Sequence, residues 1–440
     1  MKVLVYFCLA IFAGMGRAKA DMVILQADLD SPVVLAGQKQ HLYLKVAIDG
    51  QTLADNKRIP ANVAIVLDRS GSMAGQKLRD AKKAAMQAIR RLAKNDIVSV
   101  VAYDDNAKVV VPATKVTDQE TIIQAIAGIE DGGSTALFAG VAKGAAELRK
   151  FLNREHANRI ILLSDGLANV GPSSPSDLAE LGASLAKEGI SVTTLGLGLD
   201  YNEDLMTRLA MASDGNHAFI ENSANLAQIF AKEFGDILAV VAQDLFIEIN
   251  CAEGMRPLRV LGKEVDIDGN KVIMRINQLY AQQQKFIILE VDAPAVVLKS
   301  GQTSSPMQLA TVQLSYDDME TKKRTQKMAV SNVSYANSQK LVDQSVNSSV
   351  KIAVAELMGA EKTKLAVKLR DEGKKQQAQV VLQESAKDLD DVGSRYGSEK
   401  LKQQAKTRLN RAEQLDDDEW KRSRKNLRED EYKSVQQQKY

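Results

Sequence analysis

Three short segments carry hydroxyl and carboxylate side chains that could bind a metal ion. Residues 68–73 (DRSGSM) directly follow the apolar run 62–67 (NVAIVL). Residues 132–135 (GGST) precede a helical pattern, and Asp165 follows the apolar run 159–164 (RIILLS). Hydroxyl and carboxylate oxygens suit Mg²⁺, Mn²⁺ or Ca²⁺, whereas these segments contain no thiol or imidazole. Together they predict a site for a hard divalent cation.

Alternating strands and helices between residues 61 and 240 would bring these segments together. Short apolar runs, typical of strands buried on both faces, alternate with amphipathic stretches such as residues 75–94. This order predicts an α/β domain with a doubly wound, mostly parallel sheet. Turns that follow parallel strands share the carboxyl edge, where such sheets bind ligands. Topology alone therefore places residues 68–73 beside Asp165.

The flanking regions have other patterns. Residues 21–60 and 241–336 show strand patterns separated by glycine-containing turns, so we expect one antiparallel β-sandwich with the α/β domain inserted in it. Residues 337–440 contain no proline, and helix formers predict a helical, charged C-terminal region. From Asp416 onward we expect a frayed helix or disorder, with the charges of residues 416–425 on a solvated face.

The start of the chain has the pattern of a secretory signal peptide, residues 1–20. An apolar run at residues 3–15 is followed by residues 18–20 (AKA), the small-x-small pattern that signal peptidase cuts. The run is shorter than the about 20 apolar residues that a membrane span needs, so cleavage before Asp21 is favoured over anchoring. Cleavage would leave a single cysteine, which fits a bacterial envelope protein. We expect an exported protein, periplasmic or secreted, with no transmembrane segment in the mature chain.

Charge and composition argue against other partner classes. The chain has 58 basic and 56 acidic residues, a net charge of +2, and 5% aromatic residues. This near balance gives no reason to expect nucleic acid or an anionic membrane as partner. The few aromatic residues also argue against stacking on bases.

The five oxygen-bearing residues carry a resemblance to a known family. In von Willebrand factor type A domains, a D-x-S-x-S loop, a distant threonine and a distant aspartate form a metal-ion-dependent adhesion site. This chain is similar at all five positions, which are Asp68, Ser70, Ser72, Thr135 and Asp165. The resemblance covers roughly residues 61–240. It implies that the three hydroxyls bind the metal, and that the two aspartates bind it directly or through water.

The resemblance extends in part to the whole chain. The sandwich and C-terminal helices are similar to those of bacterial calcium-activated chloride channel homologues, and more distantly to those of inter-alpha-trypsin inhibitor heavy chains. The name of the first group does not predict a channel, because the mature chain has no membrane-spanning path.

This resemblance implies protein binding rather than catalysis. Mg²⁺ is the expected cation, with Mn²⁺ or Ca²⁺ as alternatives. A shell of mainly neutral hydroxyls and water would leave the cation an open position for an Asp or Glu carboxylate of a partner protein. Two alternatives stay open. One is a structural envelope assembly factor that acts through the sandwich and helical tail. The other is a metal-assisted hydrolase, which needs a base that these loops do not supply.

Overall fold

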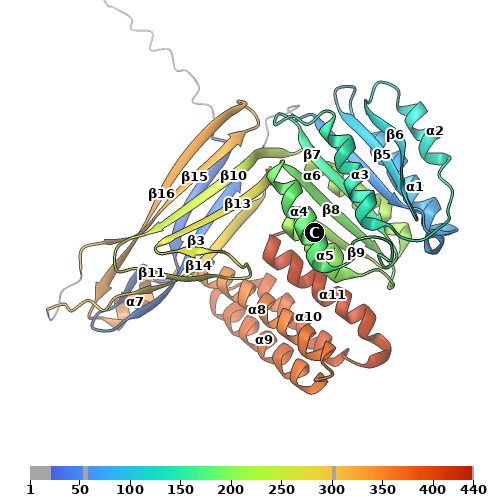
Figure 1. Ribbon diagram of the computed structural model, residues 1–440. Helices are drawn as coiled ribbons and strands as arrows, with labels where there is room; N and C mark the ends of the chain where they lie inside the picture. Colours follow the sequence, from blue (N-terminus) through green and yellow to red (C-terminus); the bar gives the residue numbers. More distant parts are fainter. Residues whose placement is uncertain (1–20, 53–57, 300–303, 439–440) are drawn as a thin grey trace, which may run out of the picture.

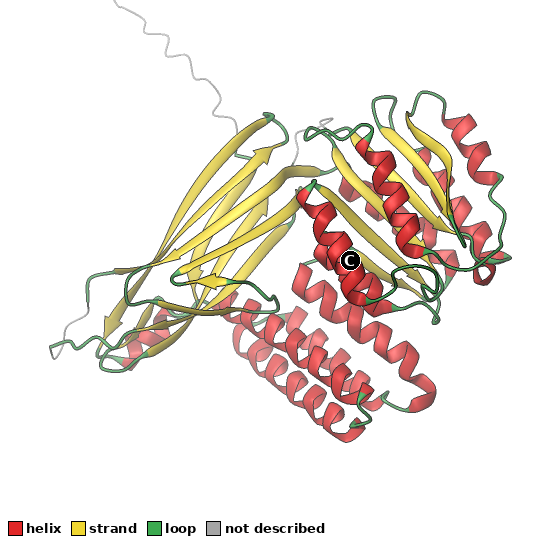
Figure 2. Ribbon diagram, viewed as in Figure 1, coloured by secondary structure: helices red, strands yellow, loops and turns green. Residues whose placement is uncertain are grey.

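The computed structural model describes residues 21–52, 58–299 and 304–438. These residues form an α/β domain, a β-sandwich and a C-terminal group of helices (Figures 1 and 2). The predicted signal peptide, residues 1–20, lies outside the described residues. Within the described ranges, no helix is long and apolar enough to cross a membrane.

The α/β domain is built on a six-stranded sheet of order β6-β5-β4-β7-β8-β9. Neighbouring strands are parallel, except that β6 pairs antiparallel with β5 at one edge. Every residue of the four inner strands is buried, which explains their continuous apolar runs. The strands are β4 (Ala61–Asp68), β5 (Ile97–Tyr103), β6 (Ala107–Lys115), β7 (Ala157–Ser164), β8 (Ile190–Leu197) and β9 (His217–Ile220).

Helices cover both faces of this sheet. One apolar core joins the sheet to α1 (Gln76–Ile89), α2 (Gln119–Ala127) and α6 (Leu226–Ile237). The other joins it to α3 (Leu137–Arg149), α4 (Pro175–Lys187) and α5 (Glu203–Ala212). The predicted doubly wound, mostly parallel architecture is therefore confirmed.

The sandwich consists of two sheets around one apolar core. The smaller sheet has the order β1-β3-β14-β11, and the larger has the order β12-β13-β10-β15-β16-β2. Before the α/β domain come β1 (Val23–Leu29), β2 (Val33–Leu35) and β3 (Gln40–Gly50). After it come β10 (Val240–Cys251), β11 (Arg256–Val260), β12 (Ile267–Asp268), β13 (Lys271–Tyr280), β14 (Gln284–Ala293), β15 (Met307–Asp318) and β16 (Lys323–Ala336).

Strand pairing shows that the α/β domain is an insertion. β3, which precedes it in the chain, pairs antiparallel with β14, which follows it, from Gln40 opposite Ala293 to Asp49 opposite Gln284. The insertion is thus as the sequence predicted. The sandwich departs from a purely antiparallel arrangement at one edge, where the short strand β2 runs parallel to β16.

Five helices complete the chain. They are α7 (Gln339–Ser345), α8 (Ser348–Asp371), α9 (Lys375–Tyr396), α10 (Glu399–Glu413) and α11 (Asp417–Gln436). α8, α9 and α10 pack on one another, and α8 also lies on the smaller sandwich sheet. There Val350, Val354 and Leu357 form a cluster with Leu261 and Ile288.

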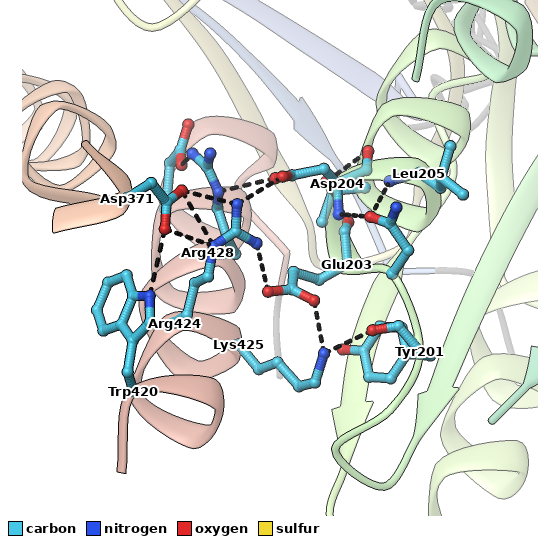
Figure 3. A network of polar contacts seen from close by, with 12 residues as sticks. Tyr201, Glu203, Asp204, Leu205, Asp371, Trp420, Arg424, Lys425 and Arg428 are labelled. Carbon is cyan, nitrogen blue, oxygen red and sulfur yellow. Dashed lines mark hydrogen bonds and ion pairs between the residues drawn. The ribbon is translucent and has the colours of Figure 1, made fainter. Parts of the chain in front are cut away.

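The expectation of a frayed or disordered end is wrong. The expectation of solvated charges holds for residues 416–419, 421 and 422, which are exposed, and fails for Arg424 and Lys425. Residues from Asp417 form the ordered helix α11, whose basic side chains bind the acidic N-terminus of α5 (Figure 3). Arg424 Nη2 donates to Asp204 Oδ2 at 2.6 Å. Lys425 Nζ lies 2.5 Å from Glu203 Oε2, and both side chains are less than a tenth exposed. Arg424 and Lys425 therefore bind within the molecule, because complementary charges on α5 face them.

α11 also covers the free edge of the α/β sheet. The edge strand β9 has its backbone amides at His217 and Phe219 directed toward this helix. They donate to Gln438 Oε1 at 3.1 Å and to Glu429 Oε1 at 3.2 Å. Pairing an edge strand in this way removes a template for self-association.

Candidate metal centre

The five predicted residues come together at the carboxyl edge of the α/β sheet. Asp68 is the last residue of β4, and Asp165 directly follows β7. These strands are parallel neighbours, paired up to Leu67 opposite Leu163. The two aspartates are therefore held at adjacent strand ends by the rigid centre of the sheet, as the topology predicted.

The hydroxyls lie against these carboxylates. Ser70 Oγ and Ser72 Oγ are 3.1 Å apart, and Ser72 Oγ donates to Asp165 Oδ1 at 2.6 Å. Thr135 and Ser72 both lie close to Gly166. A Cβ added to Gly166 would be 3.3 Å from Thr135 Oγ1 and 3.4 Å from Ser72 Oγ. The structure thus brings together oxygens from three segments that are far apart in sequence.

Backbone contacts fix the loops that carry these residues. Gly71 N–H donates to Gly133 O at 3.1 Å, and Gly132 N–H donates to Arg69 O at 2.8 Å. Gly133 has a φ of +74°, and an added Cβ would lie 2.7 Å from Asp105 Oδ2, so this position favours glycine on two grounds. The backbone amide of Thr135 donates to Asn169 Oδ1 at 2.8 Å.

Asp68 is fully buried and held by several donors. Its Oδ1 accepts from the Ser70 amide at 2.8 Å, and its Oδ2 accepts from Ser164 Oγ at 2.7 Å and from the Tyr103 hydroxyl at 3.4 Å. Burial raises the pKa of Asp68, and the charge of Asp165 adds to this rise, while hydrogen bonds from Ser70 and Ser164 oppose it. A nearby positive charge would therefore favour the ionised carboxylate.

Lys77 is a further residue at this site that sequence reasoning missed. Its Nζ lies 2.5 Å from Asp165 Oδ2, and the Asp165 side chain is fully buried. Ser164, Tyr103 and Asn169 were missed as well. Each follows or lies near a predicted segment, but only the folded chain shows which of them reaches the carboxylates or the loop amides.

The donor set fits a hard divalent cation. It offers three hydroxyls and two carboxylates, which are ligands that Mg²⁺, Mn²⁺ and Ca²⁺ accept. In the described part of the chain, no group of three or more His, Cys, Asp and Glu side chains could hold a metal ion. The candidate site has only Asp68 and Asp165 of these types, so its character depends on the hydroxyls.

Sequence comparisons agree with this arrangement. Residues 62–232 match the von Willebrand factor type A domain family. Protein sll0103 of Synechocystis sp. is 31% identical over 218 residues, which cover 50% of each chain. YfbK of Escherichia coli is 26% identical over 213 residues, and human inter-alpha-trypsin inhibitor heavy chain H3 is 30% identical over 169 residues. The match to YfbK covers 48% of this chain and 37% of that protein. The match to heavy chain H3 covers 36% of this chain and 18% of that protein.

Two solved structures share the fold over most of the molecule. A von Willebrand factor type A protein from Catenulispora acidiphila superposes with a TM-score of 0.70 at 17% identity, covering 89% of each chain. The ArnB paralog VWA2 from Sulfolobus acidocaldarius superposes with a TM-score of 0.63 at 18% identity, covering 94% of this chain and 98% of that one. The family match assigns residues 62–232 of this chain to the von Willebrand factor type A domain family.

Proposed function

We propose that this protein is a metal-ion-dependent protein-binding module. The observation that carries the proposal is the convergence of Ser70, Ser72 and Thr135 on the two aspartates at the ligand-binding edge of the sheet. Domains of this family are usually binding modules without catalytic activity. The proposed ligand is an Asp or Glu side chain on a partner protein.

The mechanism follows from the charge of the donors. A bound Mg²⁺, or alternatively Mn²⁺ or Ca²⁺, would supply an open coordination position for the partner's carboxylate. Ser70, Ser72 and Thr135 would hold the cation through neutral oxygens, so they leave its charge largely uncompensated. Asp68 is oriented by Ser70 and Ser164, and Asp165 by Ser72 and Lys77. The protein thus offers a preformed, weakly neutralised cation site.

This proposal favours binding over metal-assisted hydrolysis. A hydrolase needs a base positioned near the metal. In the described part of the chain, the hydrogen-bond partners of the five side chains, apart from one another, are hydroxyls, a backbone amide and Lys77, with no histidine or glutamate among them. We also propose that the protein is exported to the bacterial envelope. The signal peptide pattern of residues 1–20 supports this location.

A matched pair of variants at Thr135 tests the metal site. Thr135 is only 4% exposed, so its replacement must preserve shape. Thr135→Val keeps the branched shape and removes the oxygen, whereas Thr135→Ser keeps the oxygen. We expect calorimetric titration with Mg²⁺ or Mn²⁺ to show binding by the wild type and Thr135→Ser. We expect at least a tenfold weaker affinity for Thr135→Val, of the order lost when a supporting metal contact is removed.

Affinity capture from the envelope tests the partner. Immobilised protein should retain a specific partner in Mg²⁺ and release it in chelator, and Thr135→Val should retain none. Absence of metal binding by the wild type, or equal metal binding by Thr135→Val, would contradict the proposed function.

A further inference from the structure

Lys77 brings a positive charge into the site that the cation would occupy. Its Nζ lies 2.5 Å from Asp165 Oδ2, while Asp165 Oδ1 accepts the Ser72 hydroxyl. Asp165 is fully buried, so its interaction with a cation is weakly screened by solvent. In this arrangement, the ammonium neutralises one of the two carboxylates of the site.

Lys77 lies at the start of α1, where its main interaction is the ion pair with Asp165. It is the second residue of the helix, whose first turn contains no acidic residue. A positive charge there opposes the helix dipole, so the helix itself gains no stability from a lysine at this position. The ion pair with Asp165 is the favourable interaction that the structure gives to this side chain.

The side chain also has space to move away from Asp165. It is 37% exposed, and it borders a cavity of about 560 Å³ lined also by Leu197, Gly198 and Asn222. Gly198 lies beside the ammonium, because a Cβ there would be 3.9 Å from Nζ, an ordinary van der Waals contact. Glu221 also lines the cavity, and its carboxylate is paired there with Arg422.

We propose that Lys77 is a built-in competitor of the metal ion, which sets the metal affinity of the site. In the metal-free protein its ammonium pairs with Asp165, and a divalent cation must displace it or bind against its charge. The site therefore needs a higher concentration of free cation to be half filled than it would need without Lys77. This inference rests on the proposed function, since it concerns the same metal site.

Charge-removing and charge-keeping variants test this role. Lys77→Met removes the ammonium and keeps most of the aliphatic chain, whereas Lys77→Arg keeps a positive charge. Lys83→Met is the matched control, because Lys83 is an exposed residue of the same helix. Calorimetric titration with Mg²⁺ and Mn²⁺ should show about tenfold tighter binding for Lys77→Met. We expect Lys77→Arg and Lys83→Met to stay within about twofold of the wild type.

The outcomes separate this inference from the function on which it rests. If the wild type binds metal and Lys77→Met binds it equally or more weakly, the competitor role is wrong while the metal site stands. If the wild type and all variants bind no metal, the proposed function and this inference both fail. Circular dichroism and thermal melts of the metal-free variants establish that each one is folded.

Discussion

Asp68 links the metal site to the stability of the metal-free protein. Its carboxylate is fully buried and accepts from the Ser70 amide and from Ser164 Oγ. A carboxylate at a solvated sheet edge could be truncated at little cost in stability. The structure instead places donors around Asp68 that would lose their acceptor on truncation.

Two substitutions at Asp68 should therefore differ in stability while both weaken metal binding. Asp68→Ala leaves buried donors unpaired, which costs about 1–3 kcal/mol. Asp68→Asn keeps an acceptor for Ser70 and removes the charge that burial penalises, so we expect a change within about 1 kcal/mol. Urea denaturation in chelator measures both values, with the exposed Asp266→Asn as the charge control. Equal destabilisation by Ala and Asn would show that these hydrogen bonds do not stabilise the fold.

Arg69 shows the limit of reasoning from a motif alone. It lies in the same loop as Ser70 and Ser72, and its cationic side chain cannot ligate a metal, so from the motif alone Arg69→Ala would be an inert control. In the structure, its guanidinium pairs with Asp104 and donates to Glu130 O at 3.0 Å. These contacts lead to the loop that carries Gly132 and Thr135. A neutral control must therefore lie elsewhere, as Asp266 does.

Among the elements, α11 is stabilised by ionic contacts. Arg424 contacts Glu203 and Asp204 at the start of α5, and it also donates to Asp371 at the end of α8 (Figure 3). These contacts hold the pKa of Arg424 above its usual value despite partial burial, and the charges of Arg428 and Arg424 keep the pKa of Asp204 below its usual value. The Arg424 guanidinium therefore bridges α5 and α8.

Removing this guanidinium should be costly, whereas removing a nearby surface charge should not. The Arg424 side chain is 20% exposed, so Arg424→Met leaves carboxylates partly buried with one cation fewer. We expect a loss of about 2–4 kcal/mol in the free energy of unfolding. Lys421→Met is the control in the same helix, because Lys421 and Asp200 are 3.7 Å apart and about three-quarters exposed. Its cost should stay below about 1 kcal/mol. Similar losses for both variants would argue against a special role of Arg424 in docking.

Local patterns predicted the elements that form by burying apolar surface. The inner strands β4, β5, β7 and β8 are buried and mainly apolar, so the sheet and the position of residues 68–73 beside Asp165 could be inferred from the sequence. Thr135 was assigned to the site only by the family resemblance. The edge strand β6 was not predicted. It is partly exposed and contains Pro112, which an edge strand tolerates because it need not donate on both sides.

Other features depend on contacts between distant segments and had no local signal. α11 has few apolar residues, and its order comes from carboxylates more than 200 residues away, such as Glu203 and Asp204. For Lys77, likewise, the sequence pattern indicated only a position in an ordinary amphipathic helix. Its role appears only when Asp165 is brought to the same sheet edge by the fold.

For the whole molecule, α11 is the element that touches all three parts. The Tyr432 hydroxyl donates to Gly215 O of the α/β domain at 2.7 Å. Leu427 packs with Val367 of α8 in a cluster of the helical group. Lys285 of the sandwich strand β14 donates to Gln436 O at 2.9 Å. Deleting the entire region from residue 337 would therefore disturb the α/β domain, so that deletion cannot isolate the role of the tail.

Deleting residues 417–440 should uncouple the parts of the molecule. The intact protein should unfold in one main calorimetric transition, because α11 contacts all three parts, and a metal that binds only the folded protein should raise its midpoint. Without α11, its contacts with the α/β domain and with Lys285 of the sandwich are lost, and the β9 amides lose their acceptors. We then expect at least two transitions, of which Mg²⁺ shifts only the one that belongs to the α/β domain. We also expect concentration-dependent association in sedimentation experiments, because the edge of β9 is uncovered. A single transition that shifts as a whole with Mg²⁺ in the truncated protein would show that α11 does not couple the parts.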